Sequence, residues 1–145
     1  MTDNERLGFI KKDAVQGFTR FCGLEVVSIE PGVCVTRVKL VDHHLQQDGF
    51  VHAGLIAMMA DHTSGYSAFT LVPPDRRILT IEYKINFLKP AFGDYLECQG
   101  KVIKPGKHTL VCESEVFSVR DGKKELAAKA MLTMAAVPED KVPKP

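Results

Sequence analysis

The chain has 145 residues, the length of one ordinary domain. Hydrophobic residues make up 45% of it and charged residues 26%, so the composition excludes wholesale disorder, a collagen and a disulfide-rich scaffold. The formal net charge is +1, and this balance indicates neither a nucleic acid partner nor a strongly charged protein partner. We expect a single domain over residues 1–145.

The cysteines and the N-terminal segment indicate a reducing compartment. The cysteines form no C-x-x-C pair and lie among apolar or β-branched neighbours: Cys22, Cys34, Cys98 and Cys112. We expect buried free thiols rather than disulfides or a zinc site. Segment 1–16 contains acidic residues and no sustained apolar run, so it does not resemble a signal peptide. The expected location is the cytoplasm.

The N-terminal part of the chain is predicted to be helical and then to enter a β-hairpin. Apolar residues recur at three- and four-residue steps through 5–21: Leu7, Ile10, Ala14, Phe18 and Phe21. This spacing predicts one amphipathic helix within segment 1–22. Two β-rich runs, 24–30 and 33–40, then flank Pro31-Gly32, a pair that suits a tight turn.

A long apolar helix is predicted next. It should begin near Val51-His52, after a polar loop, and end before Pro73-Pro74, because a residue before proline avoids the helical region. The apolar stretch 53–72 approaches the length of a membrane span, but Asp61 lies at its centre, which favours a buried helix and argues against a membrane partner.

The remaining half of the chain is predicted to form β-strands. They are expected over 78–88, 95–104, 108–119 and 125–137, and Asp121-Gly122 is a strong hairpin signal between the last two. The tail 138–145 is rich in proline and charge, and we expect it to fray. Because the central helix is apolar nearly all round, it must be enclosed. The sequence therefore predicts an α+β fold in which an antiparallel sheet of about six strands wraps around one long central helix.

Two features of the central helix point to chemistry. Asp61 is an acid in a buried helix interior, where aspartate is rare unless it has a partner or a task. His52-Ala53-Gly54 opens the helix, and the first amide N–H groups of a helix lack internal partners and can bind an oxyanion or carbonyl oxygen. Structural alternatives stay open for both features. Asp61 could pair with Arg76 or Lys84, and His52 could only cap the helix.

At these residues the sequence resembles the phenylacetate-degradation type of acyl-CoA thioesterase, which has the hotdog fold. His52 and Asp61 keep the family spacing of nine residues. A second family motif matches the stretches Phe87-Leu88-Lys89-Pro90-Ala91 and Gly93-Asp94. The order of elements matches from about residue 24 to residue 137. The resemblance implies hydrolysis of an acyl-CoA to the free acid and coenzyme A.

The chain departs from the family pattern at three positions. Ala53 replaces a glycine whose backbone N–H polarises the thioester carbonyl, and alanine keeps that N–H. Gln46 aligns with the family asparagine, and its amide is expected to orient a water or the thioester, with Gln47 as a neighbouring candidate. Lys89 stands where the family often has a hydroxyl residue.

The expected mechanism needs no metal and no cofactor. Asp61 acts either as general base toward a water or as the nucleophile, and these two roles stay open. Four residues are candidates for binding the coenzyme A phosphates, namely Lys89, Lys104, Lys107 and His108, and Arg76-Arg77 is a further candidate. Possible acyl-contacting residues are Phe50, Met58, Met59, Tyr66, Phe69 and Phe87. Aryl-acetyl and medium-chain acyl groups both remain possible, as does an acyl-carrier-protein substrate.

Two other functions stay open. One is a non-catalytic protein that binds or senses acyl thioesters, and the other is an acyl-thioester dehydratase or hydratase on the same fold. For the hydrolase, Ala53 and Asp61 are eight residues apart on one helix, or about 12 Å, too far to act on the same carbonyl. We therefore expect a homodimer, and by resemblance also a homotetramer. In it, Gln46 and Ala53 of one chain would face Asp61 of the other.

Overall fold

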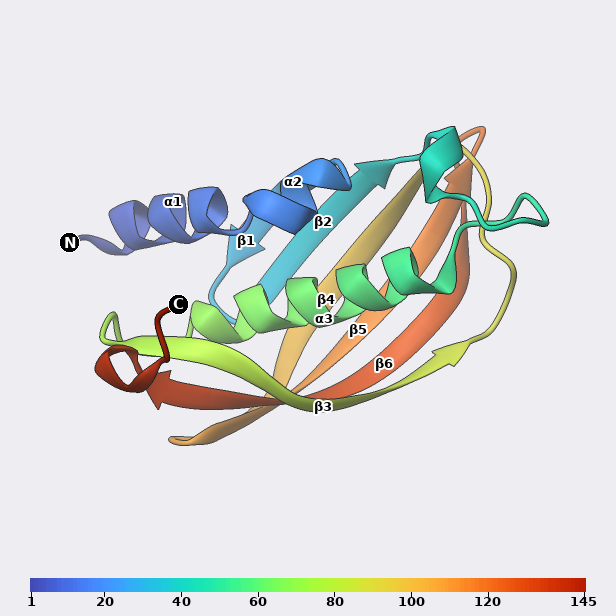
Figure 1. Cartoon of the computed structure of the whole chain (residues 1–145). Helices are drawn as coiled ribbons and strands as arrows, with labels where there is room; N and C mark the ends of the chain where they lie inside the picture. The colour runs from blue at the N-terminus through green and yellow to red at the C-terminus, as the bar shows by residue number, and fades with distance from the viewer.

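The computed structural model describes residues 1–145 as one layer of sheet packed on one long helix, with two short helices beside it (Figure 1). The helices are α1 (Asp3–Asp13), α2 (Gly17–Phe21) and α3 (Ala53–Phe69). The strands are β1 (Leu24–Glu30), β2 (Val33–Lys39), β3 (Arg76–Phe87), β4 (Tyr95–Pro105), β5 (Thr109–Arg120) and β6 (Lys123–Pro138). Short 3-10 helices span Asp42–His44 and Glu139–Lys141.

The strands form one six-stranded antiparallel sheet in the order β1-β2-β4-β5-β6-β3. Figure 1 shows this sheet curving around α3, which confirms the predicted α+β architecture. Side chains along β5 alternate between the two faces, and Leu110, Cys112 and Val116 are buried toward the helix. The four cysteines are free and buried, as predicted. None of the helices combines the length and apolarity that crossing a bilayer requires.

The α3 helix lies close against the sheet. A Cβ atom built on Gly100 of β4 would lie 3.0 Å from the Thr63 carbonyl, so a larger residue would push the helix and strand apart by a few tenths of an ångström. The helix ends at Phe69, a few residues before Pro73-Pro74. Thr70 caps it, because its hydroxyl donates to the Ser67 carbonyl and accepts the Gly32 N–H at 2.7 Å.

The prediction of one N-terminal helix is wrong, because the segment forms two. Gly17 has a φ of +50°, which breaks the helical path, and the Thr19 hydroxyl accepts the Gln16 N–H at the start of α2. The expected apolar face is therefore interrupted. Ile10 is fully buried, whereas Phe18 is 64% exposed.

The C-terminal tail does not leave the domain directly after β6. The Glu139 N–H donates to the Asp75 carbonyl at 2.9 Å, and the Glu139 carboxylate pairs with Arg77 of β3 at 3.3 Å. These contacts attach the first residues of the tail to the start of β3. The first residues of segment 138–145, which was expected to fray, are therefore held against the domain.

The β3 strand is an edge of the sheet with apolar side chains in solvent. Leu79, Ile81, Tyr83 and Phe87 are 44–55% exposed. An unpaired strand edge that carries apolar side chains is a template for pairing with another chain. The β3 edge therefore has the properties of a contact surface.

Candidate active site

The start of α3 presents one free backbone donor. His52 is the N-cap: its Nδ1 accepts the Gly54 N–H at 2.8 Å, and its carbonyl accepts the Leu55 N–H at 3.0 Å. The Ala53 N–H, by contrast, donates to no group of the chain. His52 therefore has the capping role that the sequence left open, and the Ala53 N–H is left without a partner in the chain.

Ala53 lines a cavity of about 500 Å³, which we call the amide cavity. Its lining consists of Gln46, Gln47, Phe50, Val51, His52, Ala53, Ile56, Phe87, Leu88, Lys89, Pro90 and Ala91. Residues 46–53 and 87–91 meet here because the Val51 N–H donates to the Ala91 carbonyl at 2.8 Å. His52 of the first family motif and residues 87–91 of the second thus line one cavity, whereas Asp61 of the first motif does not.

Gln46 is held by its own loop. Its backbone N–H donates to the Phe50 carbonyl at 2.7 Å, and its side-chain Oε1 accepts the Asp48 N–H. The side-chain NH₂ group has no partner within the chain. Gln47 also lines the amide cavity but is exposed. The structure therefore places Gln46, His52, Ala53 and Lys89 in the lining of one cavity.

Asp61 lies in a different cavity, between α3 and β3, which we call the acid cavity. Its volume is about 150 Å³, and its lining is Asp13, Asp61, His62, Gly65, Tyr66, Phe69, Arg77, Ile78 and Thr80. Asp61 forms no ion pair with Arg76 or Lys84; instead the Thr80 hydroxyl donates to its Oδ1 at 2.7 Å. Its Oδ2 has no partner within the chain.

Sequence reasoning missed Thr80. The two residues are 19 positions apart, and their contact arises because β3 crosses α3. No spacing rule within a helix or strand connects them. A threonine on an exposed edge strand gives no signal of its own.

The neighbouring side chains leave Asp61 without a cation. Burial lowers the pKa of His62, and its Nε2 bonds the Ala14 carbonyl at 2.7 Å. An imidazole kept neutral gives Asp61 no counter-charge. Burial, followed by a hydrogen bond to Asp13, raises the pKa of Tyr66, so its hydroxyl stays protonated as a donor.

The candidate phosphate-binding residues do not gather in one chain. Lys89 lines the amide cavity. Lys104 lies nine residues farther along β4 than Tyr95, which is about 30 Å in a strand, and Lys107 and His108 follow in the turn to β5. In one chain these three residues therefore occupy the far end of the sheet.

The candidate acyl-contacting residues divide between the two cavities. Phe50 and Phe87 line the amide cavity, and Tyr66 and Phe69 line the acid cavity. Met59 is fully buried in the core, and Met58 lines neither cavity. Within one chain, the free N–H and the acid thus belong to separate cavities.

Comparisons with known proteins show the family. Residues 48–125 match the model of the thioesterase superfamily. A protein of Saccharolobus solfataricus, provisionally named as an esterase, is 34% identical over 84% of each chain. The 1,4-dihydroxy-2-naphthoyl-CoA hydrolase of Listeria monocytogenes is 26% identical over 69% of this chain and 81% of its own length.

A solved structure also supports membership of this family. A thioesterase family protein from Silicibacter pomeroyi superposes with a TM-score of 0.88 at 28% identity, over 94% of this chain and 99% of that one. This chain belongs to the thioesterase superfamily. The predicted hotdog fold and family resemblance are confirmed, and thioester hydrolysis is the general reaction that this membership supports.

Proposed function

We propose that the protein hydrolyses acyl-CoA thioesters to a free acid and coenzyme A. The observation that carries the proposal is the pair of unused groups on α3: the free Ala53 N–H in one cavity and the unpartnered Oδ2 of Asp61 in another. The named Listeria relative is a hydrolase of an aromatic acyl-CoA, which supports this substrate class.

The Ala53 N–H serves as the oxyanion donor. The thioester carbonyl oxygen lies about 3 Å from this N–H, and the positive end of the α3 dipole favours the charge that develops on it. Gln46 lines the same cavity, and its NH₂ group, which has no partner within the chain, orients the carbonyl or the attacking water.

Asp61 drives the attack by one of two routes. As a general base, it takes a proton from water while the water oxygen bonds to the carbonyl carbon. The tetrahedral intermediate then collapses, the C–S bond breaks, and the thiolate takes from Asp61 the proton that came from water. As a nucleophile, Asp61 bonds the carbonyl carbon, expels the thiolate and forms an anhydride that water hydrolyses. Thr80 fixes the carboxylate in both routes.

Both groups act on one carbonyl only if two chains share the site. Ala53 and Asp61 lie eight residues apart on α3, about 12 Å, so one chain cannot bring them to the same atom. Pairing of two β3 edges about a two-fold axis covers Leu79, Ile81 and Tyr83 and sets the two α3 helices antiparallel. The minimal active unit is then a homodimer.

The phosphates of coenzyme A are bound at the mouth of the amide cavity by Lys89. Lys104, Lys107 and His108 contribute to the same nucleotide only from another copy of the chain, as in a tetramer.

The assay for the proposal is release of free thiol from a panel of acyl-CoAs, with binding measured in parallel. The wild type should release thiol, and Asp61→Asn should lose most of this turnover while still binding. A protein that only binds acyl thioesters would release none. A hydratase would modify the acyl chain with the thioester intact. Either result contradicts the proposal.

A further inference from the structure

The acid cavity runs along α3 away from Asp61. Asp61, Gly65 and Phe69 occupy successive turns on one side of the helix and span about 12 Å. On the β3 side, Thr80 lies at the Asp61 end, and Arg77 lies over the Phe69 ring at 5.4 Å. The cavity therefore has its reactive end at Asp61 and a far end at Phe69.

Gly65 keeps the middle of this cavity open. A Cβ atom built on Gly65 would meet no other atom within 4 Å. A larger residue here would project into the space between Asp61 and the far end. The volume of about 150 Å³ thus depends on a residue without a side chain.

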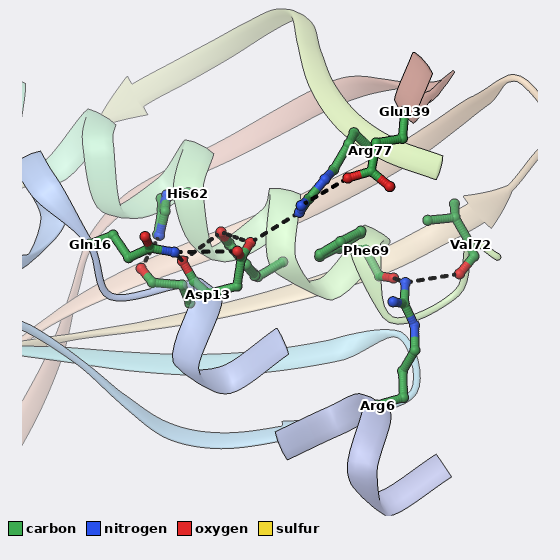
Figure 2. A network of polar contacts seen from close by, with 10 residues as sticks. Arg6, Asp13, Gln16, His62, Phe69, Val72, Arg77 and Glu139 are labelled. Atoms are coloured by element: carbon green, nitrogen blue, oxygen red, sulfur yellow. Dashed lines mark hydrogen bonds and ion pairs between the residues drawn. The ribbon is translucent and has the colours of Figure 1, made fainter. Parts of the chain in front are cut away.

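Three polar side chains line the cavity next to Phe69, and we call them the end wall: Asp13, Tyr66 and Arg77. The Tyr66 hydroxyl donates to Asp13 Oδ2 at 2.9 Å, and Arg77 Nη1 lies 3.4 Å from the same oxygen. Arg77 is braced in turn by Glu139 at 3.3 Å (Figure 2). The N-terminal segment, the central helix and the C-terminal tail meet at this wall.

The end wall resists an apolar chain. The Asp13 side chain is only 20% exposed, and Tyr66 and Arg77 both bond its carboxylate. A long acyl chain would have to separate this ion pair and leave a partly buried carboxylate against methylene groups, which is unfavourable.

We propose that the end wall determines the acyl specificity, restricting the enzyme to compact, ring-sized acyl groups and excluding medium and long chains. The inference rests on the proposed function, since Asp61 places the thioester carbonyl at the open end of the cavity. A dry cavity of about 150 Å³ in another protein binds benzene, which sets the size of the group that fits. Phenylacetyl and butyryl groups match this volume, and dodecanoyl does not.

The test compares kcat/KM for butyryl-, phenylacetyl-, octanoyl- and dodecanoyl-CoA. The wild type should favour the first two. Arg77→Ala should open the wall and raise the octanoyl-to-phenylacetyl ratio of kcat/KM by on the order of 10-fold, the lower end of the discrimination that one methylene group gives in an apolar pocket. Gly65→Leu should fill the cavity and depress phenylacetyl-CoA turnover far more than turnover of acetyl-CoA.

Arg6→Ala is the matched control. Arg6 also stacks on the Phe69 ring, at 4.9 Å, and bonds the Phe69 and Val72 carbonyls, yet it does not line the acid cavity (Figure 2). Its substitution should leave the chain-length profile unchanged. If Arg77→Ala does not fold, Gly65→Leu carries the test, because leucine is a better helix former than glycine.

Equal kcat/KM for phenylacetyl- and dodecanoyl-CoA in the wild type would contradict the proposal that the end wall limits the length of the acyl group. So would an unchanged profile in both folded cavity variants. If no thioester is hydrolysed, the proposed function is wrong. The effect of the end wall on chain length can still be tested, by measuring the dissociation constants of non-hydrolysable S-alkyl-CoA thioethers of different alkyl length. Affinity that is indifferent to alkyl length would then refute it, and a length cut-off that Arg77→Ala relaxes would support it.

Discussion

The hydroxyl of Thr80, on β3, donates a 2.7 Å hydrogen bond to Oδ1 of Asp61, on α3. The bond sets the rotation of the carboxylate and leaves Oδ2 of this cavity-lining residue without a partner within the chain. A catalytic carboxylate benefits from such a fixed orientation, because the reacting atoms must meet within a narrow geometry.

Thr80→Val should therefore lower kcat, by roughly 10- to 100-fold, because the carboxylate loses its orienting bond while the residue keeps its shape. Thr80→Ser retains the hydroxyl and should remain near wild type. Thr80 is exposed, so the melting temperatures of all three proteins should agree closely. A valine variant with wild-type kcat would remove Thr80 from the mechanism.

Ala53→Pro offers a selective test of the oxyanion donor. Proline is favoured at the first position of a helix and lacks only the N–H. His52 already has φ −61° and ψ 132°, which a following proline requires. The variant should fold normally and lose on the order of 10²–10³ in kcat. Ala53→Gly, which keeps the N–H, serves as the control, and equal activity of the proline and glycine variants would exclude this donor.

Lys89→Ala should raise KM for acyl-CoA while leaving an N-acetylcysteamine thioester, which has no phosphates, unaffected. The wild-type KM for acyl-CoA should also rise with ionic strength, because an exposed lysine is screened by salt. Lys11→Ala, on α1 and outside both cavities, is the control. Equal KM values for Lys89→Ala and wild type would show that Lys89 binds no phosphate of coenzyme A.

The sequence could predict the parts of the fold that local pattern controls. The apolar stretch 53–72 predicted a buried helix, and turn pairs such as Asp121-Gly122 separated the strands correctly. The break at Gly17 could not be found, because the spacing of Leu7, Ile10, Ala14, Phe18 and Phe21 suits an uninterrupted helix.

The site divides in the same way. Gln46, His52, Ala53 and Asp61 could be proposed as site residues because they lie close in sequence and align with a family motif. Thr80 and the end-wall residue Asp13 were missed, because tertiary packing alone brings them to α3. The capping role of His52 required its Nδ1 contact, since sequence left two roles open.

Buried His44 makes stability depend on pH. Its Nε2 bonds the Cys22 carbonyl at 2.8 Å, and its Nδ1 accepts the Val41 N–H at 3.1 Å, so the neutral ring satisfies both contacts. Burial, assisted by His43, lowers the pKa of His44. Burial likewise lowers the pKa of His62.

Because these folded-state pKa values are depressed, the unfolded chain binds more protons in mild acid. The free energy of unfolding should be highest above the ordinary histidine pKa of about 6.5 and fall as pH decreases below it, by at most about 1.4 kcal/mol per pH unit for each histidine. Guanidinium unfolding of wild type and His44→Gln from pH 7 to pH 5 measures the slope. An identical slope in the two proteins would show that His44 does not contribute to the pH dependence of the free energy of unfolding.

The most direct test of the shared site is complementation between two inactive chains. Asp61→Asn should lose about 10²–10⁴ in kcat, and Ala53→Pro should be similarly impaired. When the two are allowed to exchange subunits, half of the dimers become mixed, and each mixed dimer contains one site with an intact Ala53 N–H and an intact Asp61. Thiol release should return to roughly a quarter of the wild-type rate. A mixture that exchanges subunits, as shown by tagged chains, yet stays inactive would contradict the site shared between two chains.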